Sequence, residues 1–149
     1  MKKRYKLIIF IFAAIFLIIG YRKYFFTFNN LGDGTYFKGP IDSPHGKYTA
    51  EAYYKNYGDA AGGAKVWVTI TNRQNNETAT VYYGVGKSNF GIKWEDENNI
   101  YIENDEGQDY PYSDTSVMLE VGKEIYDESG RACKSWLMKD EYETCYPHE

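Results

Sequence analysis

An unbroken apolar run near the N-terminus limits this chain more than any other feature. Residues 7–20 have the sequence LIIFIFAAIFLIIG, and basic segments flank them at residues 2–6 and 21–26. Such a run is either a retained transmembrane helix or the apolar part of a cleaved signal peptide. Cleavage requires small residues before the cut, whereas here bulky and charged residues follow Gly20. We therefore expect a retained anchor.

The flanks of this run predict its length and its orientation. Leu7–Tyr21 as a helix spans about 22 Å, against about 30 Å of hydrocarbon. Flanking Lys and Arg side chains can snorkel, and the aromatic residues of 24–28 suit the membrane interface. Four basic residues precede the run and two follow it. The positive-inside rule therefore predicts a cytoplasmic N-terminus and an extracytoplasmic C-terminal domain on the cell membrane, with residues 1–28 as stub and anchor.

The charge of the remaining chain excludes one class of partner. Six of the 17 basic residues lie in the first 28 positions and all 21 acidic residues follow them, so residues 29–149 carry a formal net charge of −10. Nucleic-acid binding requires clustered Lys and Arg, so we expect no nucleic-acid partner. The expected partners are the membrane, through the anchor, and a protein or envelope component.

The sequence after residue 43 has the period of β-strands. Residues 47–54 place alanine and tyrosine side chains on one face, and residues 64–72 alternate Val66, Val68 and Ile70 with polar or aromatic residues. Six short strands are predicted: 47–54, 64–72, 78–85, 92–94, 100–102 and 116–121. We expect an all-β domain, mainly an antiparallel meander folded as a sandwich or partial barrel, after one N-terminal transmembrane helix.

The same pattern predicts the domain boundaries. Residues 29–43 are rich in Gly, Asn, Asp and Pro and are expected to be a linker, followed by a β domain over residues 44–127. The tail, residues 128–149, fits either a short helix or a last hairpin. It contains the two cysteines of the chain, Cys133 and Cys145. Outside the cytoplasm two cysteines favour one disulfide, and in a reducing compartment they would be free thiols.

Two short motifs resemble a known repeat. Residues 43–48 (SPHGKY) resemble the Ser-Pro-Asp-Gly-Lys-Tyr opening of a TolB-type β-propeller blade. Residues 92–96 (IKWED), with the strand at 100–102, resemble the Trp-x-Asp turn of the same blades. A propeller requires several blades and no second copy is present, so these motifs do not predict a propeller.

The order of these motifs resembles a family of small membrane-anchored proteins of Gram-positive bacteria, described only as a domain of unknown function. The shared pattern is an apolar N-terminal segment, Ser-Pro-x-Gly-Lys-Tyr, Gly-Gly-Ala at residues 62–64, and Ile-x-Trp-x-Asp. It extends over roughly residues 43–127. The chain departs from the pattern at His45, where Asp is usual, and in its cysteine-containing tail. The resemblance implies a fold and a location but no activity.

Three sets of residues resemble ligand sites but match the known patterns poorly. Residues 84–88 (GVGKS) lack the first Gly and the following helix of a phosphate-binding loop, so we expect a hairpin turn. The acidic segment 95–114 does not match an EF-hand loop, but Asp105, Glu106 and Asp109 are calcium candidates, the alternative being a solvated loop. The two histidines lack metal-ligand spacing. We expect no cofactor and no enzyme activity.

The abundance of aromatic residues predicts a binding surface. The chain has 16 tyrosines, and Tyr53, Tyr83 and Tyr101 are candidates for an exposed row on one sheet surface. Such a row would suit a protein, peptide or glycan ligand. The predicted function is a membrane-anchored, extracytoplasmic, non-enzymatic interaction or binding module. The alternatives are an immunity-like protector against a secreted toxin and, less well supported, a cell-envelope hydrolase.

Overall fold

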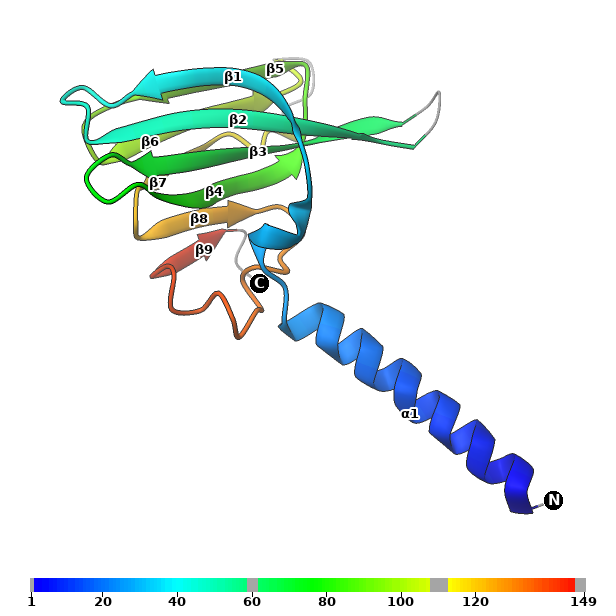
Figure 1. Cartoon of the computed structure of the whole chain (residues 1–149). Coiled ribbons are helices and arrows are strands. Elements are labelled where there is room, and N and C mark those ends of the chain that lie inside the picture. The colour runs from blue at the N-terminus through cyan, green and yellow to red at the C-terminus, as the bar shows by residue number, and fades with distance from the viewer. Residues whose placement is uncertain (1, 59–61, 108–112, 147–149) are drawn as a thin grey trace.

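A computed structural model describes residues 2–58, 62–107 and 113–146 of the chain. In these residues one long helix, α1 (Lys2–Tyr24), leads into a short 3-10 helix, η1 (Phe28–Leu31), and then into a two-sheet β structure (Figure 1). The strands are β1 (Thr35–Asp42), β2 (Tyr48–Tyr57), β3 (Gly63–Asn72), β4 (Glu77–Val85), β5 (Asn89–Trp94), β6 (Asn99–Asp105), β7 (Val117–Glu120), β8 (Glu124–Asp127) and β9 (Thr144–Tyr146).

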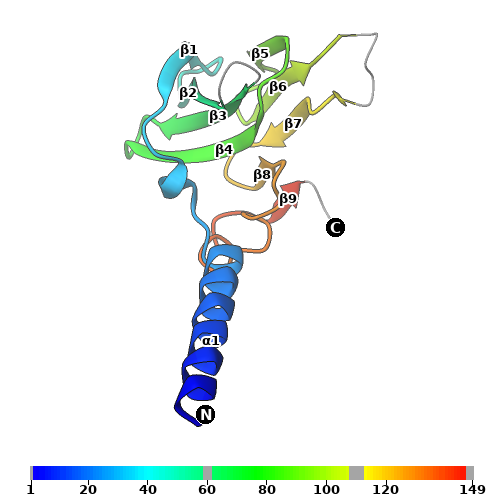
Figure 2. The same cartoon turned by 90° about the vertical axis from the view of Figure 1, so that its right-hand side faces the viewer.

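Helix α1 projects from one end of the β structure (Figures 1 and 2). Its 23 residues span about 34 Å, which exceeds the hydrocarbon thickness of a bilayer. The window Tyr5–Tyr24 has a mean hydropathy of 2.0, and none of it is buried in the protein. Length and composition therefore allow this helix to cross a membrane, as an anchor or as a signal sequence. The helix exceeds the uncharged run because Arg22 and Lys23 favour helix and lie at its negative C-terminal end.

The β structure is a sandwich of two unequal sheets. The larger sheet has the strand order β1-β2-β3-β4-β8-β9 and the smaller one β5-β6-β7. All six strands expected from the sequence are present, and the all-β class with an N-terminal apolar helix is confirmed. Strands β1 to β4 form an antiparallel meander. Strand β8, however, pairs parallel to β4 and to β9, because the chain crosses to the smaller sheet before it returns.

The main core lies between the two sheets. The predicted faces are confirmed: Ala50 and Ala52 of β2 and Val66, Val68 and Ile70 of β3 are buried in this core. The smaller sheet contributes Ile92, Ile100, Ile102 and Leu119. The two inner faces together form the apolar layer expected of a sandwich.

A second core covers the opposite face of the larger sheet. Trp67 and Tyr83 are neighbours on this face and are 6% and 8% exposed. They pack with Phe26 and Phe28, which follow α1, and with residues of the C-terminal tail. The tail members are Ala132, Met138 and Cys145. Segments from both ends of the chain therefore bury this face.

Two predicted boundaries are wrong for this reason. The expected linker, residues 29–43, contains the edge strand β1, whose pairing with β2 shifts register twice and so hides the alternation. The tail, residues 128–149, was expected to form a helix or a hairpin; its described residues, 128–146, instead supply turns and the parallel strand β9. In both views the tail lies beside the end of α1 (Figures 1 and 2).

The predicted disulfide is present between Cys133 and Cys145, with a Cα–Cα distance of 5.3 Å. Cys145 is buried in the second core, and Cys133 packs against that core. The bridge closes a short loop of the tail, which includes Ser135 and Met138, over the sheet face.

Removing this bridge is expected to destabilise the fold. Replacing both cysteines by Ser, Cys133→Ser with Cys145→Ser, frees a loop of sequence separation 12 in the unfolded chain. The loop-entropy model then predicts a loss of about 3 kcal/mol in the free energy of unfolding, measurable by guanidinium titration. A reducing agent should lower the free energy of unfolding of the wild type to that of the double variant and leave that of the double variant unchanged. Quantitative thiol labelling of both cysteines in denatured, unreduced protein would show that no bridge exists.

Candidate functional site

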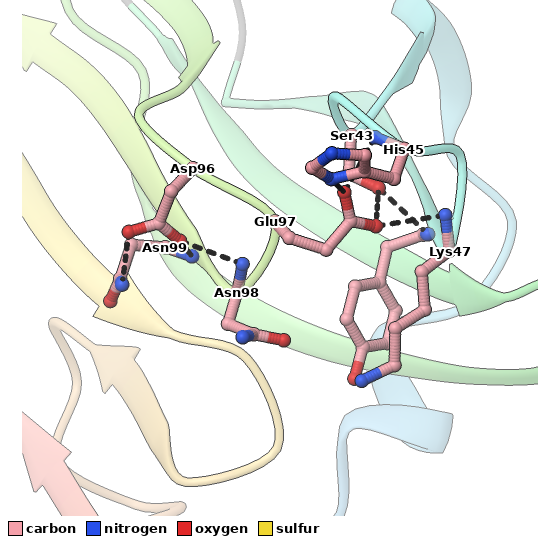
Figure 3. Close-up of polar contacts among 8 residues, drawn as sticks. Ser43, His45, Lys47, Asp96, Glu97, Asn98 and Asn99 are labelled. Atoms are coloured by element: carbon pink, nitrogen blue, oxygen red, sulfur yellow. Dashed lines mark hydrogen bonds and ion pairs between the residues drawn. The ribbon is translucent and has the colours of Figure 1, made fainter.

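One carboxylate joins the two turns that carry the sequence motifs (Figure 3). Glu97, in the turn between β5 and β6, accepts hydrogen bonds from Ser43 Oγ at 2.6 Å and from the backbone N–H of Lys47 at 2.9 Å. Its other oxygen accepts from the backbone N–H of His45 at 2.6 Å and lies 3.0 Å from His45 Nδ1. The Glu97 side chain is 19% exposed. It therefore fixes the β1–β2 turn to the smaller sheet.

The local sequence shapes both turns. Gly46 has φ +72°, a conformation that glycine adopts without strain, and its N–H donates to Ser43 O at 2.8 Å. In the turn between β5 and β6, Asp96 accepts hydrogen bonds from the backbone N–H groups of Asn98 and Asn99, each at 2.8 Å (Figure 3). The residues that resemble a propeller blade therefore meet here as two interlocked turns.

Ser43, His45 and Glu97 do not form a catalytic triad, although the residue types match one. In a triad the serine hydroxyl bonds to the histidine, which the carboxylate orients. Here Ser43 Oγ donates directly to Glu97 and accepts the N–H of Tyr48 at 3.0 Å. Ser43 is also 3% exposed, so a substrate cannot reach it. The hydrogen bond from Ser43, with those from His45 and Lys47, lowers the pKa of Glu97 to about 2. The cluster is structural.

The three tyrosines predicted as one surface do not lie together. Tyr53 and Tyr83 flank Trp67 on the outer face of the larger sheet, and Tyr83 is buried there. Burial raises its pKa. Tyr101 belongs to β6 in the smaller sheet. The reason is that the chain changes sheet after β4, which period-two alternation cannot reveal.

The calcium candidates and the segment that resembles a phosphate-binding loop also do not form ligand sites in the described residues. Asp105 accepts hydrogen bonds from Asn89 and from the N–H of Gly107, and Glu106 accepts one from Ser88. Asp109 lies outside the described residues. Among the described residues no group of three or more His, Cys, Asp or Glu side chains is placed to hold a metal. Residues 84–88, where a hairpin turn was expected, comprise the end of β4 and the connection 86–88 to β5 of the other sheet.

A cavity at the junction of α1 and the larger sheet is the candidate functional site. Its volume is about 450 Å³, within the range of small-molecule sites. All of its charged lining residues are basic, although the chain after residue 28 is strongly acidic. These residues are Arg22, Lys55, Lys65 and Arg131. The remaining walls are mainly aromatic, from Tyr21, Phe25, Phe26, Tyr57, Trp67 and Tyr83.

The cationic groups are held against these aromatic walls. Lys65 Nζ lies 5.8 Å from the ring centre of Tyr57 and 5.7 Å from that of Tyr83. Arg131 Cζ lies 4.5 Å above the ring of Phe26. Such contacts position a cation while leaving N–H groups available for an anion. The site can therefore bind a negatively charged group beside aromatic surfaces.

Part of this site could be found in the sequence and part could not. Tyr53, Lys55 and Tyr57 alternate along β2, and the strand register pairs Lys55 with Lys65 of β3. The period of residues 47–54 and 64–72 predicted both strands, but not the pairing of Lys55 with Lys65. Arg22 and Arg131, however, come from segments interpreted as anchor and loose tail, and only the packing of both segments onto the sheet brings them to the cavity.

The Glu97 cluster makes stability depend on pH in a defined direction. Because its pKa falls from 4.5 to about 2 on folding, the carboxylate stabilises the fold above about pH 4.5 and loses this effect as the pH falls towards 2. Glu97→Gln should therefore lower the melting temperature at pH 7, and its difference from the wild type should shrink across that window. Glu95→Gln is the control, since the Glu95 side chain forms an ion pair with the exposed Lys93. A Glu97→Gln difference that stays constant from pH 5 to pH 2 would contradict the assignment.

Comparison with known proteins identifies a family. The model of a family of unknown function, DUF5412, matches residues 2–129. The match covers α1, both interlocked turns, strands β1 to β8 (all of the sandwich strands except β9) and most of the cavity lining. No curated protein and no solved structure matches the chain. The chain belongs to the DUF5412 family of unknown function.

Proposed function

We propose that this protein is a single-pass membrane protein that holds a non-enzymatic binding module at the outer surface of the cell membrane. One observation carries the proposal: α1 continues without a tether into the second core. Phe26 and Phe28, two and four residues after the helix, are buried in that core. A helix able to span a bilayer is thus joined directly to the packed domain.

Contacts at the end of α1 support a retained anchor. The N–H of Trp136 donates to Tyr24 O at 2.9 Å, and Ser135 Oγ donates to Phe26 O. Trp136 is 64% exposed and packs with the rings of Tyr24 and Phe25. Exposed tryptophan and tyrosine at the end of an apolar helix are typical of the membrane interface. The domain would then lie directly on the lipid surface.

Charge and cysteine chemistry support the orientation. More basic residues precede α1's apolar run than follow it, which favours a cytoplasmic N-terminus. The Cys133–Cys145 bridge fits an oxidising compartment on the other side. The strongly acidic charge of residues 29–149 fits a domain that does not collapse onto an anionic surface except at its basic cavity.

Binding is supported over catalysis by what the polar side chains do. Ser43 and Glu97 are occupied by each other, and Asn104 bonds Tyr82 and Thr115 inside the sandwich. The cavity instead presents cations and aromatic faces, which are groups of recognition. An immunity-like protector would be a special case of this module with a protein ligand. A hydrolase would need a nucleophile–base pair or an acid pair converging on one cavity.

Membrane topology is directly testable. A reporter enzyme that is active only outside the cytoplasm should be active when fused after Glu149 and inactive when fused before Met1. The intact mass of the membrane-extracted protein should include residues 2–20, since the anchor is retained. A mass that begins after Gly20 would show a cleaved signal sequence, and activity of the N-terminal fusion alone would show the reverse orientation.

A further inference from the structure

We propose that the basic cavity binds the phosphate headgroup of an anionic phospholipid, with an acyl chain lying along the outer half of α1. This inference rests on the proposed membrane location and names the ligand class of the same site. Its occupant is a lipid of the surrounding membrane, recognised by charge at the headgroup and by apolar contact along the chain.

The arrangement of the lysines indicates an anionic ligand. Lys55 and Lys65 occupy directly paired positions on β2 and β3, where like charges destabilise a sheet. Among the described residues no carboxylate forms an ion pair with either lysine, with Arg22 or with Arg131. A bound phosphate would relieve this repulsion and accept several charge-assisted hydrogen bonds at once.

Lys55 and Arg131 are two of the basic residues that line the cavity. A Cβ placed on Gly32 would lie 3.2 Å from Lys55 Nζ, so this ammonium folds over the loop that follows η1. Arg131 Nε donates to Ser129 Oγ at 3.3 Å and the guanidinium also hydrogen-bonds the side chain of Tyr83, so other N–H donors of its five remain for a ligand. Phe26 and Tyr83 provide apolar walls below the cations. The cavity therefore has a charged rim and an aromatic floor.

An apolar groove next to the basic cavity indicates that the anionic ligand is a lipid. An apolar groove of about 490 Å³ runs beside α1 and has no charged lining residue. It shares Tyr21 and Phe25 with the basic cavity, so the two are adjacent. The other groove residues are Phe16, Leu17, Ile18, Gly20, Tyr24 and Trp136. A phosphate site that adjoins an apolar groove on a membrane helix has the shape of a phospholipid.

The depth of the site also matches a headgroup. Arg22 lies in the last turn of α1, where the apolar window Tyr5–Tyr24 ends. Phosphates of the leaflet lie just beyond the hydrocarbon layer, at the level where Lys and Arg side chains snorkel. The cations of β2 and β3 lie beside the same helix end. They would meet the lipid phosphate without moving the domain.

The test uses the full chain purified in dodecylmaltoside micelles. Thermal unfolding is followed while dioleoylphosphatidylglycerol, dioleoylphosphatidylcholine or inorganic phosphate is added at equal phosphate concentration. The cavity variant carries Lys55→Gln, Lys65→Gln and Arg131→Gln. Its control carries Lys38→Gln, Arg73→Gln and Lys93→Gln, which remove the same charge away from the cavity. Arg22 stays unchanged because it contributes to membrane orientation.

Phosphatidylglycerol should raise the melting temperature of the wild type and of the control variant more than phosphatidylcholine does. The cavity variant should bind it roughly two orders of magnitude more weakly, because each cation near anionic lipid contributes a factor of about five. Two further variants keep the test decisive if the triple variant unfolds. Lys55→Gln alone, at an exposed position, should weaken binding about fivefold. The leucine side chain of Gly20→Leu would extend into open space in the groove. This variant should therefore weaken the binding of lipid but not that of inorganic phosphate.

Three results would overturn the proposal. Equal effects of the two lipids would show that the charge is not recognised. Retention of the phosphatidylglycerol effect in the cavity variant, or in Lys55→Gln if the triple variant unfolds, would place the lipid elsewhere. An equal effect of inorganic phosphate, unaffected by Gly20→Leu, would make the ligand a free phosphate. Because micelles carry no sidedness, these outcomes are independent of the topology reporter, which tests the proposed function alone.

Discussion

The larger sheet has two apolar faces, and the need to cover both of them determines the rest of the structure. One face packs on the three-stranded sheet, as in any sandwich. The other presents Trp67 and Tyr83, which no second sheet covers. The chain uses its two ends instead: the segment after α1 supplies Phe26 and Phe28, and the disulfide-closed tail supplies Met138. An apolar helix at one end of the chain is thereby built into the domain, which explains why the basic cavity forms at their junction.

Charge has two separate roles in this molecule. At the β1–β2 turn the Glu97 carboxylate receives its hydrogen bonds from a buried serine and from backbone N–H groups, so it holds the two sheets together. At the end of α1 the charges face a cavity and find no acidic partner among the described residues. The Glu97 carboxylate has hydrogen-bond partners within the protein and therefore stabilises the fold. The cations that line the cavity have no acidic partner among the described residues, which favours a ligand of negative charge.

Alternation of side chains predicts strands β2 to β7 because alternate residues of each face the core between the two sheets, as Val66, Val68 and Ile70 show. It fails at β1, where two register shifts and Pro40 interrupt the period. It also misses β8 and β9, whose four and three residues are too short to show a period. The cavity was not predictable because Arg22 and Arg131 are 109 positions apart, and only the second core brings them together. The disulfide partners were predictable, since the two cysteines of the sequence have one way to pair.

The segment after α1 packs in the core of the domain and is not a flexible tether, and one comparison of variants tests this directly. The free energy of unfolding of the full chain should fall by about 3 kcal/mol for Phe28→Ala, because a buried aromatic side chain leaves a cavity. Phe37→Ala is the matched control, since Phe37 on β1 is 50% exposed and should cost far less. Equal and small losses for the two variants would show that residues after α1 do not pack on the sheet, and would contradict the account.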